Sequence, residues 1–177
     1  MKKQLTIFHG TGSNSKSYWH PYIKVNLEKE DYDVIIPNLP NTDTPKLDET
    51  LEFVDKNVSI QDDSIFIWHS SWCPLILSLL EKLNVNVKRV ILVAWFCDTL
   101  NSKMLQSKYN WDVIKSKCQE FIFINATNYP WWCNDLQGRK MFEKLWWTLI
   151  INNEGHMVSW TYNQDYKEFP LLLKLIK

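Results

Sequence analysis

The fold is decided by one stretch, Ile65-Phe66-Ile67-Trp68-His69-Ser70-Ser71-Trp72-Cys73-Pro74-Leu75-Ile76-Leu77. It contains a short apolar run typical of a buried strand, a polar corner at Ser70, and an apolar run of helical length. A strand that turns sharply into a helix with a serine at the corner is the setting of a nucleophile elbow, G-x-S-x-G. Trp68 and Trp72 stand where that motif has glycine, so the stretch has the setting and the serine without the glycines.

Short apolar runs alternate with helical patterns on both sides of this stretch. We expect strands over residues 5–8, 33–37, 64–67, 88–94, 121–124 and 148–151. We expect helices over residues 17–30, 47–58, 74–83, 111–117, 134–145 and 166–176. This alternation predicts a three-layer α/β fold, with a mostly parallel sheet of about six strands and helices on both faces. No repeat, low-complexity tract or linker divides the chain, so we expect one domain over residues 1–177.

Composition restricts the partners and the compartment. Twenty basic residues balance twenty acidic ones, so no overall charge attracts nucleic acid or an anionic membrane. The start of the chain lacks the pattern of a secretory leader, and no apolar run reaches the roughly 18 residues of a membrane span. Cys73, Cys97, Cys118 and Cys133 show no C-x-x-C spacing. We therefore expect a cytoplasmic protein with reduced thiols, no metal and no cofactor.

Chemically useful side chains directly follow the expected strands. Ligands of parallel α/β sheets bind beyond the carboxyl ends of the strands. Five side chains fall at such positions, namely His9, Ser70, Asp98, Tyr129 and His156. We therefore expect them to gather at one edge of the sheet.

Ser70 and His156 have the types and the chain order of a nucleophile and its base. A serine hydroxyl is a poor nucleophile unless a base takes its proton. The oxyanion hole in such sites uses the backbone N–H after the nucleophile, here Ser71, and one from an early strand-end loop, here Thr11. Taken alone, Ser70 would be a helix N-cap and His156 a surface histidine. We interpret His9 and His69 as structural or wall residues.

Short motifs spread along the chain extend this interpretation. They are His9-Gly10, Asn38-Leu39-Pro40, the stretch around Ser70, Leu92-Val93-Ala94, Trp111-Asp112-Val113-Ile114 with Cys118, the loop 127–130, and Gly155-His156. With them the sequence resembles, over almost its whole length, the small serine hydrolases typified by retinoblastoma-binding protein nine and the bacterial YdeN proteins. The resemblance implies a compact α/β-hydrolase fold, a Ser-Asp-His triad, and hydrolysis of small esters or amides.

The acid of that triad is missing from its usual place. In the family it stands just before the proline of the loop after the fifth strand, a position that Tyr129 occupies here. Asp98, just past the fourth strand, is a second place from which such folds supply the acid. Asp135 is a weaker candidate, because it is better interpreted as a first-turn residue that complements a helix dipole. A Ser-His dyad and an inactive site remain as alternatives.

Tryptophan and glycine are both present in unusual numbers, with ten Trp and only four Gly. Average usage would give roughly 12 glycines. Six of the tryptophans stand where the resembled family usually has glycine, at Trp68, Trp72, Trp95, Trp132, Trp146 and Trp147. UGA is read as glycine in some uncultured bacterial lineages, so we hypothesise that UGA codons were translated here as Trp. Glycines would restore the elbow as Gly-His-Ser-Ser-Gly.

The sequence therefore predicts a monomeric, esterase-like serine hydrolase acting on a small-molecule ester or amide. Its catalytic residues would be Ser70 and His156, with Asp98 as the candidate acid. The alternative is a catalytically weak or inactive member of the same fold that acts as a binding module for an unknown protein partner.

Overall fold

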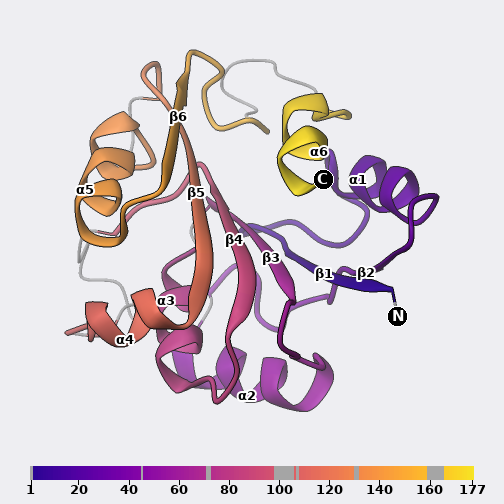
Figure 1. The fold of residues 1–177 in the computed structure, drawn as a ribbon. Helices are drawn as coiled ribbons and strands as arrows, with labels where there is room; N and C mark the ends of the chain where they lie inside the picture. Colours follow the sequence, from indigo (N-terminus) through magenta and orange to yellow (C-terminus); the bar gives the residue numbers. More distant parts are fainter. Residues whose placement is uncertain are drawn as a thin grey trace.

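One parallel six-stranded sheet organises the molecule (Figure 1). The computed structural model describes residues 2–44, 46–70, 73–97, 106, 108–129, 132–158 and 166–177. The strands are β1 (Lys3–Phe8), β2 (Tyr32–Ile35), β3 (Ile65–His69), β4 (Val87–Val93), β5 (Cys118–Ala126) and β6 (Thr148–Asn152). Their order is β2-β1-β3-β4-β5-β6, and every neighbouring pair is parallel. The predicted α/β architecture is confirmed.

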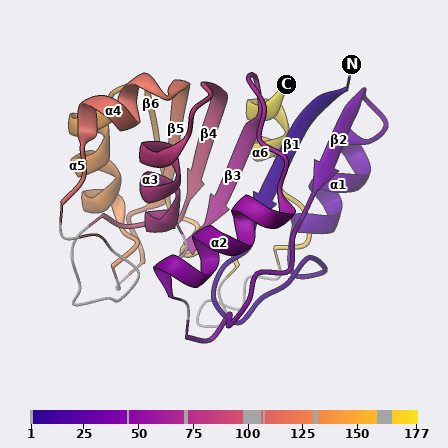
Figure 2. The same ribbon diagram turned by 90° about the horizontal axis from the view of Figure 1, so that it is seen from below.

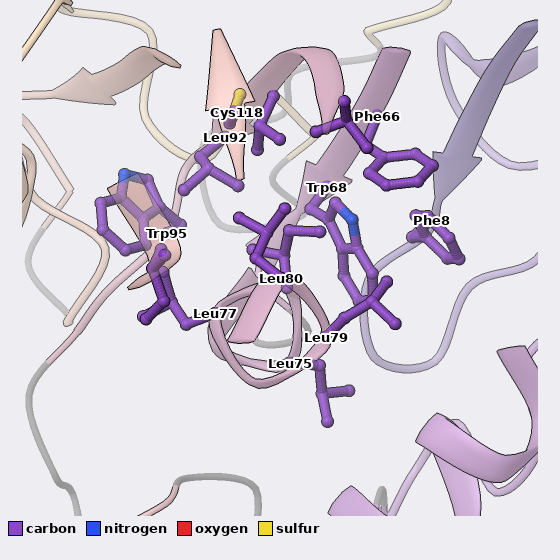
Figure 3. Close-up of a cluster of buried hydrophobic side chains, with 14 of the residues drawn as sticks. Phe8, Phe66, Trp68, Leu75, Leu77, Leu79, Leu80, Leu92, Trp95 and Cys118 are labelled. Atoms are coloured by element: carbon purple, nitrogen blue, oxygen red, sulfur yellow. The ribbon is translucent and has the colours of Figure 1, made fainter. Parts of the chain in front are cut away.

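Helices cover both faces of the sheet (Figures 1 and 2). The helices are α1 (His20–Leu27), α2 (Leu47–Asn57), α3 (Cys73–Lys82), α4 (Trp111–Ser116), α5 (Asp135–Leu145) and α6 (Pro170–Ile176). Helices α1 and α6 lie together on one face, and α2 to α5 lie on the other. The layers follow from the alternation of side chains along each strand. In β3, Phe66 and Trp68 join the apolar cluster under α2 and α3 (Figure 3). Ile65 and Ile67 join the cluster under α1 and α6.

Several element bounds differ from the predicted ones. The last helix begins at Pro170 rather than at residue 166, and α1 begins at His20 rather than at residue 17. Both helices carry proline in the first turn, the one part of a helix where its missing N–H costs nothing. Strand β5 is longer than predicted, because Cys118 and Glu120 pair with Val87 and Arg89 of β4.

The strand register brings the site-bearing loops together. Phe8 pairs with Trp68, His69 with Val93, and Ala126 with Asn152. The carboxyl ends of these strands therefore lie along one edge, from which the loops after β1, β3, β5 and β6 emerge. No helix within the described residues is long and apolar enough to cross a membrane.

Candidate active site

Ser70 occupies a strained turn between β3 and α3. Its φ is 63°, in the left-handed region that a non-glycine residue seldom adopts. Such strain persists where the surrounding structure enforces it, and it is concentrated at functional sites. The sharp strand-to-helix corner predicted at this position is present. Ser71 and Trp72, the next two residues of the predicted elbow, lie outside the described residues.

His156 lies directly beside Ser70, although 86 residues separate them in the chain. Its Nε2 is 2.6 Å from the Ser70 Oγ, a distance at which the hydroxyl donates to an unprotonated imidazole. Burial lowers the pKa of His156 to about 4. The ring is therefore neutral at pH 7 and able to accept the serine proton.

The other ring nitrogen of His156 faces no carboxylate among the described residues. With Nε2 accepting from Ser70, Nδ1 carries the hydrogen of the neutral ring. This Nδ1 is buried and has no hydrogen-bond partner in the described part of the chain. A triad acid would accept that hydrogen. Asp98 lies outside the described residues, and the Asp135 carboxylate is 3.3 Å from the Arg139 Nε in the first turn of α5.

Tyr129 presents its ring to His156. The two ring centroids are 4.6 Å apart and the planes differ by 21°, so the rings are stacked. The position that carries a carboxylate in the resembled family therefore carries a flat aromatic face against the imidazole. Tyr129 is half-buried, and its neighbour Asn128 takes part in the same loop.

Two further side chains hold the His156 loop, and sequence reasoning assigned neither of these roles. The His69 Nε2 lies 3.2 Å from the carbonyl oxygen of His156 and donates to it. The Asn128 Oδ1 accepts from the Gly155 N–H at 2.8 Å. One signal was available for His69, since it stands directly before the candidate nucleophile. The Asn128 contact depends on how two distant loops meet.

The other three histidines, His9, His20 and His69, are buried. His9 accepts the Leu39 N–H at Nε2 (3.1 Å), and its Nδ1 lies 3.1 Å from the Gly10 carbonyl oxygen. The Nδ1 of His20 lies 3.1 Å from the carbonyl oxygen of Asn14. Burial is the main cause that lowers the pKa of His20 and of His69 to about 3, and it also lowers that of His9. All three are therefore neutral at pH 7 and bonded to backbone.

The loop after β1 packs against the nucleophile. A Cβ placed on Gly10 would lie 3.0 Å from the Ser70 Cβ and 3.1 Å from the His69 Nδ1, so only glycine fits without a shift. The Ser13 hydroxyl donates to the Gly10 carbonyl at 2.8 Å and fixes this turn. Thr11 follows immediately and is exposed. This loop is therefore close enough to Ser70 to offer a backbone donor.

Metal ligands and pockets away from this cluster are the other features that could mark a site. Within the described residues, no group of three His, Cys, Asp or Glu side chains is placed to hold a metal ion. A surface pocket of about 640 Å³ lies between α2 and the end of α3, where Leu51, Val58 and Leu83 line it. It adjoins the amino ends of β3 and β4, away from Ser70.

Comparison with known proteins defines the class. No family model matches the chain. The fold matches that of alpha/beta hydrolase domain-containing protein 10 from mouse, with a TM-score of 0.72 at 12% identity over 99% of this chain and 88% of that one. It also matches an esterase (EaEST) from Exiguobacterium antarcticum, with a TM-score of 0.71 at 12% identity over 98% of this chain and 91% of that one. The chain therefore has the α/β-hydrolase fold.

One relative is similar in sequence as well. The chain is 29% identical over 112 residues to YdeN of Bacillus subtilis (strain 168), a protein inferred to be a hydrolase. That match spans 62% of this chain and 59% of the length of YdeN. The crystal structure of the ydeN gene product matches with a TM-score of 0.90 at 21% identity, covering 99% of this chain and 97% of that one. The chain is thus a homologue of YdeN, as the resemblance indicated.

Proposed function

We propose that the protein is a serine hydrolase that cleaves small esters or amides through an acyl-enzyme. The observation that carries this proposal is the 2.6 Å contact between the Ser70 Oγ and the His156 Nε2. A hydroxyl and a neutral imidazole at this distance form the nucleophile and base pair of the reaction. The fold of known esterases and the similarity to YdeN support the same class.

The reaction would proceed in two halves. The Ser70 oxygen attacks the substrate carbonyl carbon while its proton moves to His156. Backbone N–H groups of Ser71 and Thr11 stabilise the oxyanion. His156 then gives the proton to the leaving alcohol or amine, which leaves an acyl group on Ser70. Water attacks that ester with His156 again as base, and the acid product departs. No metal or cofactor takes part in this scheme.

We further propose that the enzyme is cytoplasmic and monomeric. Cys118 and Cys133 are buried free thiols. Unpaired thiols suit a reducing compartment. We propose that the protein acts there on small molecules.

Labelling with a fluorophosphonate probe tests the proposal. We expect one adduct per chain, located at Ser70 by peptide mass spectrometry. Ser70→Ala is expected to abolish labelling, and the matched control Ser59→Ala, which changes an exposed serine on the loop after α2, is expected to leave it unchanged. Labelling that persists in Ser70→Ala would contradict the proposal.

The second candidate function is a binding module without catalysis. It is favoured by the Nδ1 of His156, which has no acceptor among the described residues, and by the absence of a carboxylate at position 129. A folded wild-type protein that fails to react with the probe, and that turns over no p-nitrophenyl ester, would support this function over the first.

A further inference from the structure

The stacked pair of Tyr129 and His156 suggests how the histidine could work with no carboxylate beside it among the described residues. The Tyr129 ring covers one side of the imidazole at 4.6 Å between centroids. The face of an aromatic ring carries negative charge density, and it attracts a cation placed over it. A protonated imidazole is such a cation, and it forms in each half of the reaction proposed above.

We propose that the aromatic face of Tyr129 is a positioning element that orients the His156 ring and stabilises its protonated form, in the place of a triad carboxylate. This proposal rests on the proposed function. The ring keeps the imidazole plane fixed, so that Nε2 stays on the Ser70 hydroxyl. The phenol group is not required for this role.

The surroundings of His156 show why such support is needed. His69 faces it with ring centroids 4.9 Å apart, and is itself buried and neutral at pH 7. The Asn128 amide oxygen accepts from the backbone N–H of Gly155, the residue before His156. Glu154, two residues earlier in the chain, is exposed and accepts the hydroxyl of Tyr166. Among these described neighbours, the Tyr129 ring is the group that stacks closely on the imidazole.

The test compares three variants at one position. Tyr129→Phe keeps the ring, Tyr129→Leu removes it with an apolar side chain, and Tyr129→Asp restores the family's carboxylate. The first readout is the pKa of His156, measured by an NMR titration of the imidazole. We expect Tyr129→Leu to lower it by roughly half a pH unit, Tyr129→Phe to leave it unchanged, and Tyr129→Asp to raise it.

The second readout is the rate of fluorophosphonate labelling across pH. Tyr129→Leu should slow it by about 3- to 10-fold and move its acid limb to lower pH, whereas Tyr129→Phe should match the wild type. A Leu variant with the wild-type pKa and rate overturns the proposal, as does a Phe variant that behaves like Leu. The NMR titration applies even if no form is labelled, so failure of the proposed function is distinguishable from failure of the stacking.

A separate observation concerns the turn between α5 and β6. Trp146 has φ 64° and ψ −166°, and Trp147 has φ 93°. The conformation of Trp146 belongs to a region that is essentially restricted to glycine. Their side chains are 62% and 53% exposed, so burial of the indoles does not compensate for the backbone strain.

Two further tryptophans from the same set lie in the core. Trp68 and Trp95 are fully buried in the cluster beneath α3 (Figure 3). Trp68 stacks on Phe8, with centroids 3.9 Å apart. The indole N–H of each has no hydrogen-bond partner in the described part of the chain, and the same is true of the buried Trp19. The unpaired indole donors therefore do not distinguish Trp68 and Trp95 from Trp19.

We infer that the gene specifies glycine at positions 146 and 147, and with them at positions 68, 72, 95 and 132, through UGA codons. The codons test this directly: UGA is expected at these six positions and UGG at Trp19 and Trp111. UGG throughout overturns the inference.

A stability measurement tests the backbone argument separately. Replacing both Trp146 and Trp147 by Gly should raise the thermal midpoint by about 3 °C or more, because the strain is relieved. Trp19→Gly is the matched control and should lower the midpoint, because Trp19 is buried against Phe169. No gain in the double variant contradicts the assignment of glycine at the turn.

Discussion

The loop after β3 and the loop after β5 serve the same histidine in different ways. The first places the Ser70 hydroxyl 2.6 Å from the His156 Nε2, with the strained backbone and the close approach of Gly10 that such a turn requires. The second offers an aromatic face and an amide oxygen, and no carboxylate. The parts that position the proton transfer are thus present, while among the described residues the His156 ring meets neutral groups where a triad has a carboxylate.

This difference separates two requirements that a Ser-His-Asp triad combines. Geometry between nucleophile and base depends on the elbow, and stabilisation of the protonated base depends on the acid loop. Variants can test the two loops separately, and the first target is His156, which both loops contact.

Removal of His156 should have the largest effect. His156→Ala leaves Ser70 without a base, and loss of either partner of such a pair typically lowers kcat by about 10⁴- to 10⁶-fold. The rates of fluorophosphonate labelling and of ester hydrolysis measure this loss, with circular dichroism to confirm folding. A variant that keeps more than a tenth of the wild-type rate would show that Ser70 uses another base.

Low pH should reduce the free energy of unfolding, because two buried histidines stay neutral in the folded protein. His20 and His69 are buried with a pKa lowered to about 3, whereas each titrates near 6.5 in the unfolded chain. Between about pH 6.5 and pH 3 these histidines are protonated in the unfolded state but neutral in the folded state. The free energy of unfolding therefore falls by about 1.4 kcal/mol per pH unit for each histidine as the pH is lowered. Urea unfolding at pH 7 and pH 5 measures the slope.

The matched variants for this slope are one at the start of α1 and one in the loop after β5. His20→Phe should reduce the change of unfolding free energy with pH by about 1.4 kcal/mol per pH unit, the contribution of one histidine. Tyr129→Phe should leave this pH dependence unchanged. Equal unfolding free energies of the wild type at the two pH values would mean that the buried histidines take up protons in the folded state.

Loss of the Asn128 amide should have an intermediate effect. Asn128→Ala leaves the N–H of Gly155, a buried residue, without its 2.8 Å acceptor and loosens the loop that carries His156. We expect the labelling rate to fall by about tenfold, which corresponds to one lost buried hydrogen bond. Asn128→Asp keeps an acceptor and should retain most of the rate. If Asn128→Ala keeps the full rate, the acid loop does not support His156 through the backbone.

The smallest effect is expected at Asp135. Its partner Arg139 is largely exposed, and such ion pairs contribute about 0–1 kcal/mol. Asp135→Asn should leave the labelling rate within about twofold of the wild type and change the unfolding free energy by less than about 1 kcal/mol. A loss of a hundredfold or more would identify Asp135 as the missing acid.

The sequence was most informative where local chemistry determines the structure. The run of β-branched residues before Ala94 predicted β4 to within one residue, and the polar corner at Ser70 predicted the strained turn. The amino end of β5 was missed, because Gln119 and Glu120 are polar and their strand conformation comes from pairing with β4. Long-range pairing of this kind leaves no pattern in a single segment.

The site was predictable in part for the same reason. Ser70 and His156 follow strands whose ends meet, so their proximity follows from the topology. The stacking of Tyr129 and the bond from His69 to the His156 carbonyl depend on ring orientations that only packing determines. The sequence identified position 129 as unusual, but it gave no indication of what the tyrosine does there.

The sheet order has a consequence for when the protein becomes reactive. Ser70 follows β3 and His156 follows β6, and β4 and β5 lie between those strands in the sheet. The pair therefore forms only after the last strand has docked, and such distant pairings are late and slow steps of folding. A chain still emerging from the ribosome would carry Ser70 without its base, so its serine would stay inert until synthesis is nearly complete. In a refolding time course, probe labelling should accordingly lag behind the recovery of helical signal.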